Sequence, residues 1–148
     1  MNDMEIQFVI PRTSEECEEY FHLRWKLLRA PWEQPPGSEK DVLEDQSFHL
    51  FVKLNDMPVA VGRLHFNTEL EAQIRYMAVV PKQRKKGIGR MIVLRLEEEA
   101  RQRKADSIVL NARENSIGFY QKMGFLITGK GHTLFNKIQH VTMRKSLI

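Results

Sequence analysis

Two glycines and five basic residues, in the stretch PKQRKKGIGR at residues 81–90, precede a helical pattern. The first N–H groups of a helix have no partner within it, and the helix dipole adds about half a positive charge there. Gly87 and Gly89 allow an anion to approach the backbone closely. The basic side chains that add further donors are Lys82, Arg84, Lys85, Lys86 and Arg90. The stretch therefore predicts an anion-binding turn, and we call residues 84–90 the glycine turn.

The spacing of the glycines distinguishes this turn from common nucleotide-binding motifs. A P-loop has Lys and then Ser or Thr directly after its last glycine, and no such pair follows here. A dinucleotide-binding fingerprint has a third glycine, at the position that Ile92 occupies. A nucleic-acid interface needs only basic density, which KQRKK has, although no aromatic residues alternate with these charges for base stacking. A nucleic-acid-binding protein is therefore a remote alternative.

Strands are predicted on both sides of the glycine turn. Their ranges are 5–10, 47–54, 58–67, 71–80, 107–111, 125–129 and 140–148. The turn pair Asn55-Asp56 leaves no room for a helix, so the strands beside it form a hairpin. The last two strands are expected to be joined by a loop around Gly131 and Asn136.

Three helices are predicted between these strands. Thr13 and Glu16 form a capping box, so the first helix begins there and ends near Ala30, before a proline. Helical patterns also cover residues 88–104 and 114–123. The resulting order, β-α-β-β-β-α-β-α-β-β, predicts an α/β (α+β) fold in which helices cover a mixed sheet.

Length and composition limit the class of protein. The chain has 148 residues, 42% apolar and 28% charged, as expected for one globular domain over residues 1–148. No apolar run approaches the roughly 20 residues of a membrane span, and the N-terminus lacks a signal-peptide pattern. Cys17 is the single cysteine and is expected to be a small core residue of the first helix. We therefore expect a cytoplasmic protein without a membrane partner.

The glycine turn and its flanks together resemble the GNAT (Gcn5-related) N-acetyltransferase family. Arg84 to Gly89 matches the R-x-x-G-x-G pattern of the family's acetyl-CoA diphosphate loop. RYMAVVP before it resembles the family's fourth strand, and FYQKMGF after it resembles a segment that carries a tyrosine. The resemblance covers essentially the whole chain and is most specific from Gln73 to Phe125. It implies a mixed, mostly antiparallel central sheet of about six to seven strands flanked by helices.

The resemblance implies an acetyl-CoA-dependent enzyme that transfers an acetyl group directly to a primary amine of a small molecule or peptide. It assigns binding of this cosubstrate to Met77, Ala78, Val79, Arg84, Lys85, Lys86, Gly87, Ile88, Gly89, Arg90, Asn111 and Tyr120. A backbone N–H of residues 77–79 would stabilise the developing oxyanion. Tyr120 would stabilise or protonate the leaving thiolate. No metal is expected, because no His/Cys/Asp cluster has metal-ligand spacing.

Three positions depart from the family pattern. Gln73 stands where some members have a glutamate, and an amide cannot act as a base. Arg113 stands where many have an asparagine, which leaves Asn111 to bond the pantetheine arm, and Lys85 stands where many have glycine. The resemblance therefore does not identify the general base. Its candidates are Glu44, Glu71, His49, His65 and His140, besides a water chain or an acceptor that arrives deprotonated.

The loop after the first helix usually shapes the acceptor site in this family. Here it is residues 31–45, the acidic loop, where five acidic residues against one lysine give a net charge of −4. Two interpretations stay open: a solvated loop, or one wall of a site for a cationic acceptor such as a polyamine, an amino sugar or a lysine-like amine. A non-catalytic acyl-CoA-binding module is the main alternative function, because of Gln73. Members of the family are often dimers, so the resemblance also makes a homodimer an expectation.

Overall fold

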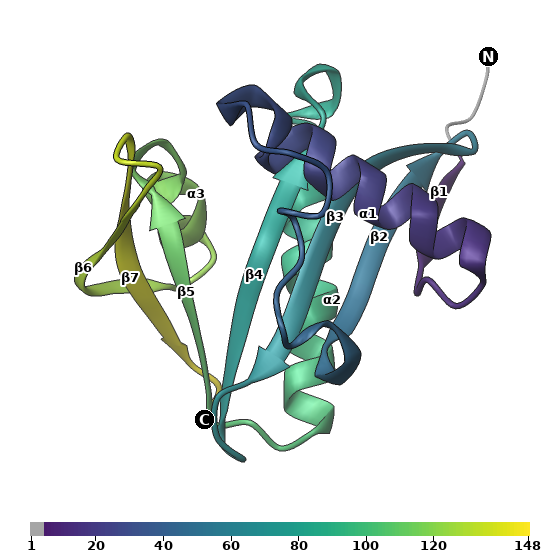
Figure 1. The fold of residues 1–148 in the computed structure, drawn as a ribbon. Helices are drawn as coiled ribbons and strands as arrows, with labels where there is room; N and C mark the ends of the chain where they lie inside the picture. The colour runs from purple at the N-terminus through teal and green to yellow at the C-terminus, as the bar shows by residue number, and fades with distance from the viewer. Residues whose placement is uncertain (1–4) are drawn as a thin grey trace.

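Seven strands form one sheet in the order β1-β2-β3-β4-β5-β7-β6 in the computed structural model, which describes residues 5–148 (Figure 1). They are β1 (Ile6–Val9), β2 (Phe48–Leu54), β3 (Met57–Phe66), β4 (Glu71–Val79), β5 (Ser107–Arg113), β6 (Leu126–Leu134) and β7 (Ile138–Ser146). β4 and β5 pair in parallel, and the other neighbours pair antiparallel. The predicted fold class is confirmed. The first four residues of the predicted domain lie outside the described residues.

Three α-helices pack on this sheet: α1 (Ser14–Leu28), α2 (Ile88–Gln102) and α3 (Ile117–Lys122). α1 crosses one face of the sheet and α2 lies on the other (Figure 1). Alternation along β2 divides the core between them, because successive side chains point to opposite faces. Leu50 and Val52 pack with Leu96 of α2, whereas Phe51 packs with Tyr20 of α1.

The predicted capping box starts α1. The Thr13 hydroxyl accepts a hydrogen bond from the Glu16 N–H (3.1 Å), and the Glu16 carboxylate accepts one from the Thr13 N–H (3.0 Å). The helix ends at Leu28, two residues before the predicted end near Ala30, because Arg29 leaves the helical range with a φ of −124°. A 3₁₀ turn, Ala30–Trp32, continues the chain into the acidic loop.

Two hairpin turns use residues in the left-handed region. Asn55 and Asp56 have φ of 50° and 65° and join β2 to β3, as predicted. Of the two residues expected in the loop between the last two strands, Asn136 lies in the turn, whereas Gly131 lies within β6, which continues to Leu134. An added Cβ on Gly131 would lie 3.0 Å from the backbone of β7, so this glycine permits close approach of two strands. The turn itself is Phe135-Asn136, with φ of 54° and 56°.

Candidate active site

A cleft opens between β4 and β5. The two strands pair only where residues 71–74 face residues 107–110, and beyond that they separate (Figure 1). A pocket of about 120 Å³ lies there. Its lining includes Leu28, Arg29, Gln73, Arg75, Tyr76, Met77, Asn111, Arg113, Ser116, Tyr120, His132 and His140. The structure thus brings together Met77, Asn111 and Tyr120, three residues that the sequence placed in the site.

A β-bulge shapes the β4 side of the cleft. Tyr76 and Met77 both stand opposite Gly62 of β3, and Tyr76 has a left-handed φ of 57°. Gly62 is required by packing, because an added Cβ would lie 2.7 Å from the Ile92 side chain of α2. The bulge redirects the backbone of β4 next to the cleft.

Beyond the bulge, β4 stays paired with β3, and its other edge, which faces β5, has no strand partner among the described residues. The Val80 N–H donates to a β3 carbonyl (2.8 Å), so by alternation Val79 presents its N–H and C=O to the opposite edge. Arg84 Nε donates to the Val79 carbonyl (3.1 Å) at that edge. By the same alternation Met77 faces the cleft and Ala78 faces β3. Of the three predicted amides, those of Met77 and Val79 are therefore placed to meet a ligand.

The glycine turn leads directly into α2. Lys85 and Gly87 have φ of 64° and 86°, and no side chain caps the helix where it begins at Ile88. An added Cβ on Gly87 would have no atom within 4 Å, so the space beside the turn is open. The side chains of Lys82, Arg84, Lys85, Lys86 and Arg90 are all exposed. This donor set fits a polyanion such as a diphosphate. The left-handed backbone also explains why glycine suits position 85.

The glycine turn lies against both β4 and α3. An added Cβ on Gly89 would lie 3.4 Å from the Phe119 ring and 3.7 Å from the Val79 side chain. Phe119 precedes Tyr120 on α3 and packs edge-to-face on its ring, with centroids 4.9 Å apart. The anion turn, the free edge of β4 and the predicted catalytic tyrosine are therefore neighbours.

Tyr120 is buried where it lines the pocket, with 8% of its surface exposed. Its ring also contacts Phe125 edge-to-face, with centroids 5.7 Å apart. Burial raises the pKa of its phenol, although the nearby charge of Arg113 opposes the rise. The side chain is thus a neutral hydrogen-bond donor at neutral pH.

β5 contributes Asn111 and Arg113 to the pocket. The Asn111 side-chain oxygen accepts a hydrogen bond from the Thr142 hydroxyl of β7 (3.2 Å). Arg113 stands directly opposite His140 of β7. Its pKa is lowered by burial and by the charges of Arg29 and Arg84. Position 113 therefore brings a cation into the cleft.

Two of the candidate bases, His49 and His65, have both ring nitrogens engaged away from the pocket. His49 Nε2 donates to the Glu44 carbonyl and its Nδ1 accepts from the Tyr20 hydroxyl, both at 2.7 Å. His65 Nδ1 accepts from Arg63 (3.1 Å), and its Nε2 donates to the Asn67 side-chain oxygen (3.2 Å). Burial lowers the pKa of both rings. Neither lines the cleft.

The two candidate glutamates are also engaged. Glu71 accepts hydrogen bonds from Arg144 and Asn67, both at 3.0 Å. Glu44 accepts from Arg24 (2.9 Å) and Arg63 (3.1 Å). Neither carboxylate lines the pocket between β4 and β5.

His140 is the one candidate base that lines the pocket. Its Nδ1 faces the backbone carbonyls of His132 (3.2 Å) and Ile138 (3.1 Å), so Nδ1 carries the hydrogen and Nε2 keeps its lone pair. The His132 ring stacks on it, with centroids 4.5 Å apart. Its pKa is lowered by burial and by the His132 ring, so the imidazole is neutral at pH 7.

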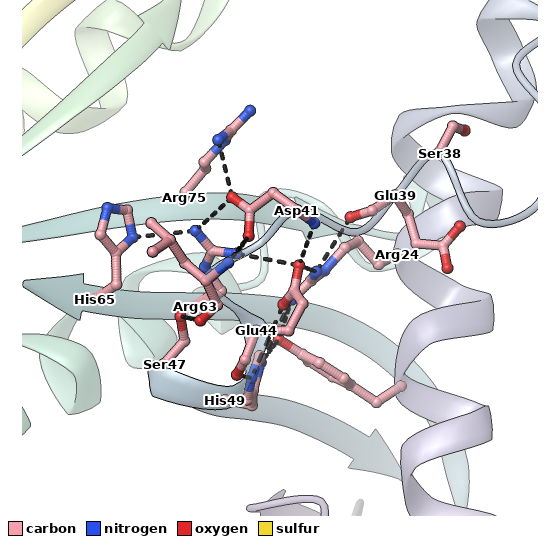
Figure 2. A network of polar contacts seen from close by, with 12 residues as sticks. Arg24, Ser38, Glu39, Asp41, Glu44, Ser47, His49, Arg63, His65 and Arg75 are labelled. Carbon is pink, nitrogen blue, oxygen red and sulfur yellow. Dashed lines mark hydrogen bonds and ion pairs between the residues drawn. The ribbon is translucent and has the colours of Figure 1, made fainter.

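The acidic loop turns two of its carboxylates inward (Figure 2). Asp41 accepts two hydrogen bonds from Arg63 (2.7 and 3.0 Å) and one from Arg75 (3.1 Å). Glu44 binds Arg24 and again Arg63. These carboxylates neutralise internal arginines and are not free to bind a cationic acceptor.

Sequence reasoning missed the arginines of this network. Arg24 and Arg63 have no exposed surface, and Arg29, which lies outside the network, is 7% exposed. One signal was present: Arg63 stands in the middle of an apolar strand pattern. A charge placed there requires a carboxylate partner, because a buried unpaired charge is costly. The sequence does not show which of several acidic residues supplies that partner.

Other expectations concern metals, membranes and Cys17. Among residues 5–148, no three or more His, Cys, Asp or Glu side chains are grouped to hold a metal ion. No described helix has the length and apolarity needed to cross a membrane. Cys17 lies on α1, as predicted, but it is only partly buried and belongs to neither core cluster.

Comparison with known proteins places this geometry among acetyltransferases. A family model for the acetyltransferase (GNAT) family matches residues 17–125. YjcF of Bacillus subtilis (strain 168), named as an uncharacterized N-acetyltransferase, is 28% identical over 137 residues, 93% of this chain and 97% of that protein. An acyl-CoA N-acyltransferase structure from Pseudomonas aeruginosa has a TM-score of 0.80 at 20% identity and covers 97% of this chain and 100% of that chain. An aminoglycoside 6'-N-acetyltransferase complexed with coenzyme A has a TM-score of 0.79 at 18% identity, covering 97% of each chain.

Proposed function

Because this chain belongs to the acetyltransferase (GNAT) family, we propose that it transfers the acetyl group of acetyl-CoA directly to a primary amine of a small molecule or peptide. The observation that carries the proposal is the cleft between β4 and β5, where the free edge of β4, a buried tyrosine and an uncapped helix start are neighbours. Acetyl-CoA supplies the activated thioester.

The glycine turn is the proposed site for the cosubstrate diphosphate. Its donors are the first N–H groups of α2 and the side chains of Arg84, Lys85, Lys86 and Arg90. The similar fold of a protein complexed with coenzyme A supports this placement. Asn111 and the cleft edge of β4 would then bond the pantetheine arm.

In the proposed reaction, a backbone N–H acts on the carbonyl oxygen of the thioester, and a tyrosine side chain acts on its sulfur. An N–H of Met77 or Val79 stabilises the negative charge that develops on the carbonyl oxygen. Tyr120, neutral because it is buried, donates a hydrogen bond to the sulfur as it leaves. The amine must lose a proton, and His140 Nε2 is the proposed acceptor of that proton.

The hypothesis of a cationic acceptor, which was drawn from the charge of the acidic loop, is weakened by the pairing of two of its carboxylates. Asp41 and Glu44 are paired with arginines and Glu39 is buried, whereas Glu33 and Asp45 are exposed at the loop surface. If charge reversal of Glu33 left the affinity for a polyamine unchanged, the cationic acceptor would be excluded.

A non-catalytic acyl-CoA-binding module is the second candidate, favoured by Gln73 at the position of a glutamate in relatives. Thiol release from acetyl-CoA, measured over a panel of primary amines, separates the two functions. Amine-dependent release with matching N-acetyl product supports the enzyme. Binding of acetyl-CoA without release for any amine supports the module. A cytoplasmic location and a homodimer remain parts of the proposal.

A further inference from the structure

The permanently charged side chains that line the pocket are all arginines. They are Arg29, Arg75 and Arg113, and no Asp or Glu is among the described residues that form its walls. A pocket built for an ammonium group needs carboxylates or carbonyl oxygens, because unlike charges attract. The composition of this lining therefore points to a negatively charged ligand group.

A chain of hydrogen bonds orients the Gln73 amide. Arg63 can only donate, so His65 Nδ1 must accept and its Nε2 must carry the hydrogen. Nε2 then donates to the Asn67 oxygen, and the Asn67 nitrogen donates to the Gln73 oxygen (2.9 Å). The Gln73 NH₂ group is left for the pocket. The residue that replaces the family's glutamate thus adds donors rather than acceptors.

The arginines outnumber the carboxylates that could neutralise them. Arg24, Arg63 and Arg75 share Asp41 and Glu44, and Arg75, which is 42% exposed, stands at the outer end of this network (Figure 2). Within residues 5–148, neither Arg29 nor Arg113 forms an ion pair.

Two further observations concern how Arg29, Arg75 and Arg113 are placed around the pocket. Arg29 binds the backbone carbonyls of Leu28 and Ser38, which fixes its guanidinium without cancelling its charge. The pKa of Arg29 is lowered by burial and, among other causes, by the charge of Arg75; that of Arg113 is lowered by burial and by Arg29. The three guanidinium groups therefore face a shared space with a surplus of positive charge.

We propose that this pocket binds an oxyanion, a carboxylate or a phosphate, that the acceptor amine carries, with Arg75, Arg113 and the Gln73 amide as its donors. This inference rests on the proposed function, because it names the acceptor class of the same cleft. Arg–oxyanion hydrogen bonds are charge-assisted and orient the ligand. The pocket volume of about 120 Å³ has room for a small anionic group.

The same charge assists the reaction without a glutamate. A positive surplus near a bound ammonium group lowers its pKa, so a larger fraction is in the neutral, nucleophilic form. Arginine is suited to this role because it stays protonated. The substitution of Gln for a glutamate at position 73 then belongs to the recognition of an anionic acceptor.

The test titrates CoA-saturated protein with inorganic phosphate and with acetate, followed by NMR. CoA must be present because the glycine turn would otherwise bind phosphate. Arg75→Gln and Arg113→Gln are compared with Arg103→Gln, since Arg103 is 47% exposed, has one carboxylate neighbour and lies outside the pocket. We expect saturable binding that weakens about tenfold in Arg75→Gln and in Arg113→Gln and is unchanged in Arg103→Gln.

Absence of saturable binding of either anion, or an equal effect in all three variants, would overturn the inference. Whichever of phosphate and acetate binds more tightly identifies the class of anion that the pocket prefers. Acetyl transfer is then compared for two matched pairs, ethanolamine with O-phosphoethanolamine and propylamine with β-alanine, and for spermidine. Preference for the anionic member supports the inference, and preference for spermidine or for the uncharged-tail members refutes it. Failure of the proposed function is distinct: it shows as no CoA binding or no transfer to any amine.

Discussion

At the scale of single residues, Tyr120 has the most specific of the proposed chemical roles. Its phenol has no hydrogen-bond partner among the described residues, so Tyr120→Phe removes a donor and keeps the packing against Phe119 and Phe125. We expect kcat to fall by about 10²- to 10⁴-fold, the range for loss of an acid–base group. Acetyl-CoA affinity and the thermal unfolding midpoint should change little. The rate of thiol release from acetyl-CoA measures kcat for both proteins. An unchanged kcat in Tyr120→Phe would remove Tyr120 from the mechanism.

The pH dependence of the reaction tests His140. The pKa of this imidazole is lowered, so its basic form dominates at neutral pH and is lost only as the pH falls below the usual value of about 6.5. We expect kcat/KM to be flat near pH 7–8 and to decrease on the acid side. His140→Gln should lower kcat/KM and abolish that acid limb. His132→Gln is the comparison variant: it should keep the acid limb but move it to higher pH, because the His132 ring lowers the pKa of His140. An acid limb that survives in His140→Gln would assign the base elsewhere.

At the scale of elements, the acidic loop depends on its buried ion pairs. Removing one partner of a fully buried pair costs roughly 3–5 kcal/mol. For Asp41→Asn we expect about 2–3 kcal/mol, because Glu44 still contacts Arg63 in the variant. Asp45→Asn, an exposed carboxylate in the same loop, should cost less than about 0.5 kcal/mol. Urea unfolding of both variants measures the difference, and equal stabilities would contradict the network's role.

The same pair predicts how stability depends on pH. Burial alone would raise the pKa of Asp41, but hydrogen bonds from Arg63 and from the Leu43 N–H outweigh it and lower the pKa to about 2. Because the folded pKa lies below the usual value of about 3.9, the stabilisation is complete above that value and is lost as the pH falls toward 2. In Asp41→Asn this part of the acid dependence should be absent.

The elements themselves were largely predictable, and their exceptions have physical causes. Period, capping residues and turn pairs gave the strands and helices, because these signals are local. The bulge at Tyr76 depends on Gly62 packing under α2, a contact between residues distant in sequence. The C-terminal turn was predicted at Asn136 but extended too far toward Gly131, because glycine favours turns and Phe135 is an unusual residue for a left-handed backbone.

At the scale of the whole molecule, the site residues proposed from motifs differ in origin from the charge of the pocket. The glycine turn, Tyr120 and the 77–79 amides are tied to local motifs. The charge of the pocket depends on which carboxylate meets which arginine, and that is fixed only when the acidic loop folds over β3 and β4. The sequence therefore left two interpretations of the acidic loop open, because composition does not show that Asp41 and Glu44 pair with arginines.

The oligomeric state is also a property of the whole molecule. β6 is an edge strand of the sheet, and it exposes 72% of Leu126 and 49% of Ile127. Exposed apolar side chains on an edge strand favour association, so we expect a homodimer that Leu126→Lys weakens. Light scattering decides this: a mass of 17.4 kDa at all concentrations for the unmodified chain would exclude the dimer.

Acetyl-CoA binding at the glycine turn is the central claim, and calorimetric titration with acetyl-CoA tests it most directly. The chain is compared with Lys85→Glu/Lys86→Glu and with the control Lys26→Glu/Lys137→Glu, which makes the same charge change at exposed sites elsewhere. We predict binding that the first pair weakens by about tenfold or more, since each lost charge contact is worth on the order of 1 kcal/mol, and that the control pair leaves nearly unchanged. No binding to the folded, unmodified chain, or equal losses in both variants, would contradict the account.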